Sequence, residues 1–170
     1  KEKADALGHE GERYDALLDL FEPGMRTAEL VGVLDGLRAD LVPFVDRVVA
    51  APAPDDAFLH RHFPQADQLA FTEELIRAIG FDMDAGRQDL STHPFTGGPN
   101  PLDVRLTTRV KEDYLPGALF ASLHEAGHGL YEQGLPVDHV RLPVCAAPSL
   151  GAHESQSRFW ENVVGRSEAF

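Results

Sequence analysis

The sequence predicts a mainly α-helical chain with one small β region, and three observations carry this prediction. Apolar residues recur at helical spacing in five separate stretches of the 170 residues. Residues 81–110 are instead interrupted by glycines and prolines, and they contain Val104–Thr108, an alternating run rich in β-branched residues. The 43% hydrophobic content is enough for one sizeable core. We therefore expect residues 1–170 to form a single region, helical in 1–80, with loops and a small sheet in 81–110, and helical again in 111–170.

Residues 1–7 are expected to be part of a helix, and three further helices are expected in the first 80 residues. Residues 14–21 and 27–49 both carry apolar stripes at the spacing of an amphipathic helix. The proline-rich residues 51–56 that follow them are predicted to be a linker. Pro64 then opens a third helix that ends at Gly80, because proline suits the start of a helix and glycine its end.

The β region is predicted around Val104–Thr108, with residues 88–92 as a possible partner strand. A strand just ahead of the next helix offers an edge to which an extended peptide can add its backbone. A small structural hairpin explains the same pattern equally well.

The stretch Leu115–Gly134 is the centre of the chain's chemistry. Its apolar residues fall on one helical stripe, while His124 and His128 lie roughly on the opposite side. Two histidines one helical turn apart can converge on a metal ion, and Glu125 between them can reach a metal-bound water. A chance H-E-x-x-H match occurs in roughly a few per cent of chains with this many histidines. The prediction of a zinc peptidase site therefore depends on finding a third ligand.

Four residues compete for the third ligand: Glu132, His139, His153 and Glu154. Glu132 lies about 6 Å beyond His128 along the helix axis, too far for a metal between the two imidazoles. His139 does not restore the metzincin spacing. A ligand at the start of a second helix, expected over about 154–164, is the remaining geometry, and it selects Glu154. His153 is then expected to hydrogen-bond within the site.

The third-ligand pattern departs from thermolysin in one respect. The thermolysin-type pattern places an acid four residues after the ligand glutamate, and that position is Arg158 here. Two histidines and one glutamate leave a fourth position for water, which is typical of catalytic rather than structural zinc.

Composition excludes several classes of protein. The formal net charge of −13 argues against nucleic acid and anionic membrane surfaces as partners. The single cysteine, Cys145, excludes an internal disulfide framework. We find no transmembrane or signal-peptide pattern and expect a cytoplasmic location. Because neither end carries a clear start or stop signal, we expect the chain to be a piece of a longer protein.

Four motifs in order resemble the carboxypeptidase Taq family of metallocarboxypeptidases. The two long motifs are His-Glu-Ala-Gly-His-Gly-Leu-Tyr-Glu-Gln-Gly and His-Glu-Ser-Gln-Ser-Arg-Phe-Trp-Glu-Asn. His93–Phe95 and Asp103–Thr107 are similar to the family's H-P-F and D-x-R-x-T motifs. The resemblance covers nearly the whole chain. Two later family motifs, an I-R-A-D-like segment and G-x-x-Q-D-x-H-W, have no counterpart here.

The resemblance implies a helical zincin-type metallopeptidase fold with a small antiparallel sheet beside the active-site cleft. It implies that His124, His128 and Glu154 are metal ligands, that Glu125 is the general acid and base, and that the metal is Zn²⁺ or Co²⁺. The full-length protein is then expected to be a homodimeric hydrolase that removes C-terminal residues from peptides, and the chain to be part of its catalytic domain.

Recognition of the substrate is the open point. A carboxypeptidase must hold the terminal carboxylate, best with a bidentate arginine. Arg105 and Arg109 are the local candidates, and His153 is a further candidate for substrate binding, although the family analogy places the main anchor outside this chain. Two alternatives therefore stay open: a zinc-dependent endo-acting oligopeptidase, and a metal-binding helical fragment without turnover.

Overall fold

A computed structural model describes all residues, 1–170. The chain divides into two compact units, residues 1–55 with 148–150, and residues 56–147 with 151–170. The first unit contains α1 (Glu2–Leu7), α2 (Arg13–Leu18) and α3 (Thr27–Ala50). The division falls at the predicted linker. That residues 1–170 form one region of a larger catalytic domain stays a prediction.

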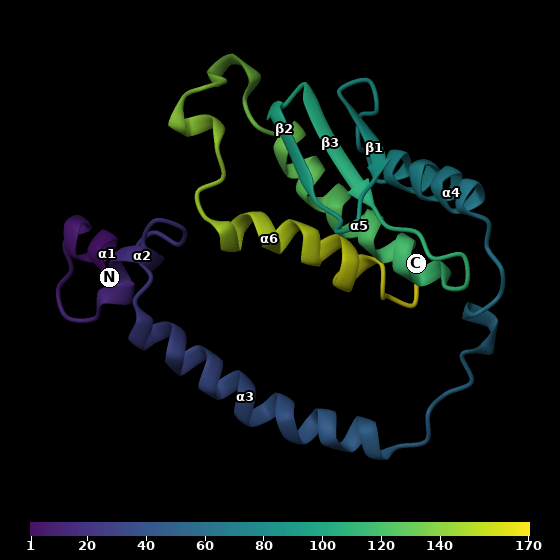
Figure 1. Cartoon of the computed structure of the whole chain (residues 1–170), viewed down its shortest axis with the longest axis horizontal. Helices are drawn as coiled ribbons and strands as arrows, with labels where there is room; N and C mark the ends of the chain where they lie inside the picture. The colour runs from purple at the N-terminus through teal and green to yellow at the C-terminus, as the bar shows by residue number, and fades with distance from the viewer. The chain divides into compact units, whose positions relative to one another are not determined.

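The second unit holds a small sheet and its helices. In chain order it contains α4 (Gln65–Ala78), β1 (Gly86–Leu90), β2 (Thr96–Asn100), β3 (Asp103–Thr108), α5 (Leu115–Gln133) and nearly all of α6 (Leu150–Arg158). A π-helical turn, Phe159–Val164, continues α6, and short 3₁₀ turns cover Ala57–Leu59, Val137–His139 and Pro143–Cys145. The prediction of a mainly helical fold with a small sheet is confirmed (Figure 1).

The sheet is mixed, so the prediction of an antiparallel sheet is wrong in this respect. Its strand order is β1-β3-β2, with β1 parallel and β2 antiparallel to β3. The predicted partner of Val104–Thr108 is correct, since Gln88 pairs with Leu106. After β1 the chain runs back in the opposite direction as β2, at the other edge of the sheet. It then reverses again and enters the space between the two strands as β3, which is therefore parallel to β1 and antiparallel to β2. The sequence of β2, Thr-Gly-Gly-Pro-Asn, gave no strand signal, and its proline is tolerated at the edge of the sheet.

The strand β3 is the central strand, which rules out the predicted substrate-binding edge at Val104–Thr108. Both sides of β3 are already paired, to β1 and to β2. The free edges of the sheet belong to β1 and β2, and β2 lies against α5, where Thr96 Oγ1 is 2.9 Å from the carbonyl oxygen of Glu125.

One hydrophobic core joins the sheet to α4 and α5. Ile76 of α4, Val104 and Leu106 of β3, and Ala126 of α5 are all at most 1% exposed and pack together. Side chains alternate along a strand, so Val104 and Leu106 face α5 and Arg105 faces away from it. The core thereby fixes α5, which carries both histidines, against the middle of the sheet (Figure 1).

The helix α3 has no buried residue in this chain. Its predicted apolar stripe is exposed, with Val33 at 65% and Leu37 at 54%. Its 24 residues still do not form a membrane-crossing segment, and neither does any other helix of the chain.

Candidate metal centre

The helix α5 places His124 and His128 side by side. Its observed bounds, Leu115–Gln133, agree with the predicted helix almost residue for residue. The two imidazole rings lie 5.0 Å apart, centroid to centroid, at 77° to each other. The opposite face of the helix holds the buried Leu123 and Ala126, as the apolar stripe predicted. One helix therefore anchors itself in the core and presents both rings away from it.

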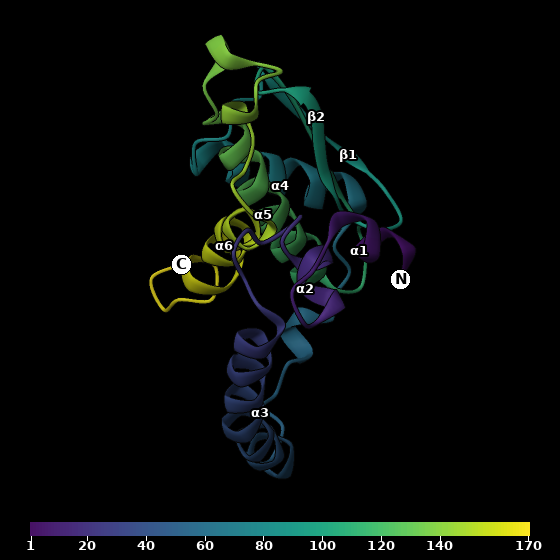
Figure 2. The same ribbon diagram turned by 90° about the vertical axis from the view of Figure 1, so that its left-hand side faces the viewer.

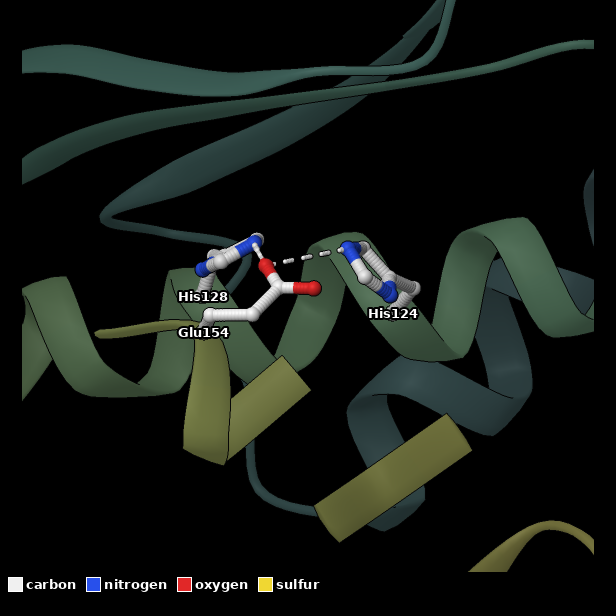
Figure 3. Close-up of side chains that lie close together, drawn as sticks. All are labelled: His124, His128 and Glu154. Carbon is white, nitrogen blue, oxygen red and sulfur yellow. Dashed lines mark ion pairs between the residues drawn. The ribbon is translucent and has the colours of Figure 1, made fainter. Parts of the chain in front are cut away.

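The helix α6 brings Glu154 to the same point (Figure 3). Glu154 Oε2 lies 3.3 Å from His128 Nε2 and 3.7 Å from His124 Nε2. One donor atom from each of the three side chains lies within 4.8 Å of the others. The residues predicted as metal ligands from two separate helices are thus close enough to share one ion.

Gly127 sets the distance between these helices. A Cβ atom at Gly127 would lie 2.6 Å from the carbonyl oxygen of Gln156 and 2.6 Å from Ser157 Cα. No side chain fits there, so the backbone of α6 rests directly on α5, and both views of the chain have the two helices adjacent (Figure 2). The glycine inside the His-Glu-Ala-Gly-His motif is therefore what lets Glu154 reach the histidines.

The three side chains fit a divalent transition metal by the chemistry of their donor atoms. Two imidazole nitrogens and one carboxylate oxygen are ligands that such ions prefer, and three protein ligands leave a position for water. The side chains of His124 and His128 are only 19% and 14% exposed, whereas Glu154 is 44% exposed. The group is therefore partly shielded from water but open on the side of Glu154.

The pKa shifts of His128 and Glu154 favour the protonation states in which both side chains can bind a metal. Burial, followed by the neighbouring His153 and His124, lowers the pKa of His128 to about 4. Burial alone would raise the pKa of Glu154, but the hydrogen bond from Arg158 and the charge of His124 outweigh it and lower that pKa. At neutral pH the imidazole of His128 is therefore uncharged and the Glu154 carboxylate ionised, the states in which both donate electrons to a metal.

A second carboxylate, Glu161, holds His124 from behind. His124 Nδ1 lies 2.8 Å from Glu161 Oε2, so with its proton on Nδ1 the ring turns the lone pair of Nε2 toward Glu154. Sequence analysis missed this residue because it tested only the position four residues after Glu154, which Arg158 occupies. Glu161 lies seven residues after Glu154, within the π-helical turn, and an acid two helical turns along was the available signal.

His153 and Glu132 pair with each other beside His124, His128 and Glu154, the three residues that we call the metal group. His153 Nε2 lies 2.7 Å from Glu132 Oε1, and the His153 ring stacks on that of His128 with centroids 4.5 Å apart. Neither belongs to the set of three converging donor atoms. His153 was predicted to bind substrate. In the structure it links the end of α5 to the start of α6.

Glu125 lies buried on the sheet side of α5. It is 6% exposed, and Thr96 Oγ1 of β2 donates a 2.7 Å hydrogen bond to its Oε2. Burial raises the pKa of Glu125, while the Thr96 hydrogen bond and the charge of His124 partly oppose that shift. A carboxylate with a raised pKa both accepts and returns a proton more readily near neutral pH.

The two arginines named as local anchors lie away from this group. Arg105 faces the opposite side of the sheet from α5 and forms two hydrogen bonds to Asp103, of 2.9 and 2.7 Å. Arg109 is exposed and donates only a long 3.4 Å hydrogen bond to the carbonyl oxygen of Thr92. The structure therefore does not bring the predicted substrate residue Arg105 together with the histidines.

A pocket of about 440 Å³ opens beside the metal group. It contains Arg166, which the sequence analysis did not identify as a site residue. His124, Glu125 and Glu161 line one part of it, and Arg166 is the only lysine or arginine in its lining. Its remaining walls are mostly apolar or aromatic and come from His93, Pro94, Tyr114, Pro116, Gly117, Phe120 and Ala121.

An H-E-x-x-H helix packed on a small sheet, with a glutamate from a second helix, defines the metallopeptidase class of fold and site. The family described as carboxypeptidase Taq (M32) metallopeptidase matches residues 1–170. The chain belongs to this family.

Individual relatives agree with this family. The chain is 50% identical over 161 residues to thermostable carboxypeptidase 1 of Thermus thermophilus, covering 94% of the chain and 32% of the relative. It is 38% identical over 164 residues to carboxypeptidase 1 of Bacillus subtilis, covering 96% and 33%. The crystal structure of the M32 carboxypeptidase from Deinococcus radiodurans R1 superposes with a TM-score of 0.94 at 48% identity, covering 98% and 33%. The chain thus spans about a third of the length of the relatives it matches.

Proposed function

We propose that this chain carries the metal site of a metallocarboxypeptidase, which hydrolyses C-terminal residues from peptides. The observation that carries the proposal is the convergence of His124, His128 and Glu154 on one point, in a chain of the M32 family. Glu125, on the same helix as both histidines, supplies a buried carboxylate with a raised pKa. Ligands and general base would then come from α5 and α6 alone.

The chemistry follows from where these side chains lie. His124, His128 and Glu154 would hold a divalent metal, which would lower the pKa of a bound water and polarise the scissile carbonyl. The Glu125 carboxylate accepts the proton of the attacking water and then delivers it to the leaving amine. Thr96 fixes the carboxylate of Glu125 through its hydrogen bond, so the base is oriented before the substrate arrives.

Zn²⁺ is the metal we propose, with Co²⁺ as an alternative. Two imidazoles and one carboxylate around an open position are a usual set of ligands for catalytic zinc. The full-length protein is further proposed to be a cytoplasmic homodimer that takes peptides, and neither nucleic acid nor membranes, as partners. The family resemblance supports the homodimer, and the net charge of −13 supports the absence of polyanionic partners.

The test uses the full-length protein, stripped of metal by a chelator and reloaded with Zn²⁺ or Co²⁺. We expect metal-dependent release of the last residue from an N-blocked dipeptide, and no cleavage of the same dipeptide with a C-terminal amide. Internal cleavage of amidated peptides would instead indicate an endo-acting oligopeptidase. Stoichiometric metal binding without turnover of any peptide would contradict the catalytic proposal and leave a metal-binding fold.

A further inference from the structure

The geometry points to Arg166 as the residue that binds a carboxylate group of the peptide in the pocket beside Glu125. This inference rests on the proposed peptidase function and adds a recognition residue to it. The starting observation is that the pocket touches His124 and Glu125 and contains Arg166 as its only permanently cationic side chain. A peptide held over the metal group therefore meets one guanidinium in this pocket.

Two contacts fix the guanidinium of Arg166. Its Cζ atom lies 4.2 Å from the centroid of the Phe120 ring, the distance of a stacked cation–π pair. Its Nη2 donates a 3.2 Å hydrogen bond to Glu161 Oε1. Both contacts already restrict the rotamers of Arg166. The side chain therefore loses less conformational entropy when it binds a ligand.

The same contacts leave Arg166 able to bind an anion. A guanidinium carries five N–H donors, and the Glu161 contact uses one of them. The Arg166 side chain is 51% exposed, so its other donors are not all enclosed by protein. By contrast, Arg105 is held by both carboxylate oxygens of Asp103 and lies outside the pocket.

Glu161 links this arginine to the metal group. One of its oxygens, Oε2, lies 2.8 Å from His124 Nδ1, and the other, Oε1, accepts the hydrogen bond from Arg166. The position of the guanidinium is therefore set relative to a predicted metal ligand by a single carboxylate. A bound carboxylate held by Arg166 would be placed at a fixed distance from the scissile bond, which is what a peptidase needs for orientation.

The ligand chemistry is a peptide carboxylate, for which the planar guanidinium fork offers paired hydrogen bonds. A peptide can supply it as its terminal α-carboxylate or as the side chain of an acidic residue. Pro94, Pro116 and Phe120 contribute apolar and aromatic walls to the pocket beside that pair.

Binding is measured with metal-loaded full-length protein carrying Glu125→Gln, which is expected to hold peptides without cleaving them. Two peptide pairs serve as probes, each measured by calorimetry with and without Arg166→Gln. The first pair is an N-blocked dipeptide ending in alanine, as the acid and as the amide. The second pair consists of amidated dipeptides ending in glutamate or in glutamine. We expect Arg166→Gln to reduce the carboxylate preference in one pair by about ten- to a hundredfold.

The outcomes separate the two carboxylate sources. Loss of the acid-over-amide preference assigns Arg166 to the terminal carboxylate, and loss of the glutamate-over-glutamine preference assigns it to an acidic side chain. Unchanged preferences in both pairs would overturn the inference. Arg166→Lys keeps the charge without the planar fork and should retain part of the preference, which gives a second reading if the glutamine variant folds poorly.

Arg109→Gln is the matched control, because it removes one exposed arginine outside the pocket and should leave both preferences unchanged. Metal content and thermal unfolding are recorded for every variant, since damage to the metal group through Glu161 would weaken all four peptides alike. Turnover by the wild-type protein is measured separately. A wild type that cleaves peptides while Arg166→Gln keeps both preferences contradicts only the role of Arg166, not the proposed function.

Discussion

His124 and Glu161 are joined by a 2.8 Å contact between Nδ1 and Oε2, on the side of the imidazole opposite Glu154. This contact fixes the ring's orientation and makes Nε2 a better electron donor, as outer carboxylates do for metal-binding histidines. The contact joins two elements, because His124 belongs to α5 and Glu161 to the π-helical turn after α6.

Glu161→Ala should weaken metal binding by about ten- to a hundredfold without removing a ligand, because His124 loses its orienting partner. The measurement is a Zn²⁺ titration in competition with a chromogenic chelator. Glu168→Ala removes an exposed glutamate from the same end of the chain and is the control. Equal affinities for the two variants would show that the Glu161 contact does not support the metal site.

Glu125→Gln should keep the metal, since no ligand is lost, and should lower kcat of the full-length enzyme by about two to four orders of magnitude. Metal content and kcat are measured on the same preparation. Near-normal turnover at full metal occupancy would remove Glu125 from the mechanism.

Glu154→Ala should reduce zinc affinity far more than Glu132→Ala does. Glu154 Oε2 lies within 3.7 Å of both histidine Nε2 atoms, whereas Glu132 binds His153 instead. Titration of both variants with zinc decides between them. If Glu132→Ala had the larger effect, the third ligand would have been misassigned.

Gly127→Ala should destabilise the fold by about 1–3 kcal/mol and also weaken metal binding. The added methyl group would meet backbone atoms of Gln156 and Ser157 at 2.6 Å, so α6 must move away from α5 and carry Glu154 with it. Gly117→Ala in the same helix meets its nearest atom, of Tyr114, only at 3.4 Å and should be tolerated. Denaturant unfolding and zinc titration of both variants test this, and a Gly127→Ala protein with normal values would contradict the tight contact.

Asp15 should make the first unit sensitive to acid. Thr27, whose backbone N–H donates to Asp15 Oδ1 at 2.7 Å, is the main cause that lowers the Asp15 pKa below its ordinary 3.8, and Arg26 adds to it. A lowered pKa in the folded state stabilises the fold above about pH 4, and this stabilisation is lost as the pH falls through the folded-state pKa. Asp15→Asn should therefore flatten the loss of unfolding free energy as the pH falls below the ordinary aspartate pKa of 3.8. An unchanged pH profile for this variant would contradict the role of Asp15.

Local signals predicted the metal helix well, and relations between distant segments were harder to predict. The bounds of α5 follow from its apolar stripe and from Gly134, both of which are short-range features. The direction of β1 could not be predicted, because it depends on where the chain places β2, a strand with two glycines and a proline. The start of α6 at Leu150 precedes the expected start by four residues; Ser149, directly before it, is of a type favoured at helix N-caps and was the local signal not used.

The difference between local sequence signals and relations between distant segments also explains which site residues could be predicted. His124, Glu125 and His128 are recognisable by spacing within one helix, and Glu154 by its place at the start of the next. Glu161 lies seven residues after Glu154 in a π-helical turn, a spacing that was not tested, and Arg166 lies in a pocket wall that no short spacing encodes. The contacts of both residues depend on how the segment after α6 packs against α5.

The exposed stripe of α3 has a consequence for local unfolding. Without a buried residue, this helix is held by its own backbone hydrogen bonds, by side-chain propensities, which Gly32 and Gly36 weaken, and by the contact of its first residue, Thr27, with Asp15. Its amide protons should therefore exchange with solvent far faster than those of β3 and α5, whose side chains fill the core. In a longer protein that covers Leu30, Val33 and Leu37, the same amides should become protected, so hydrogen exchange at α3 reports directly on whether its partner surface is in place.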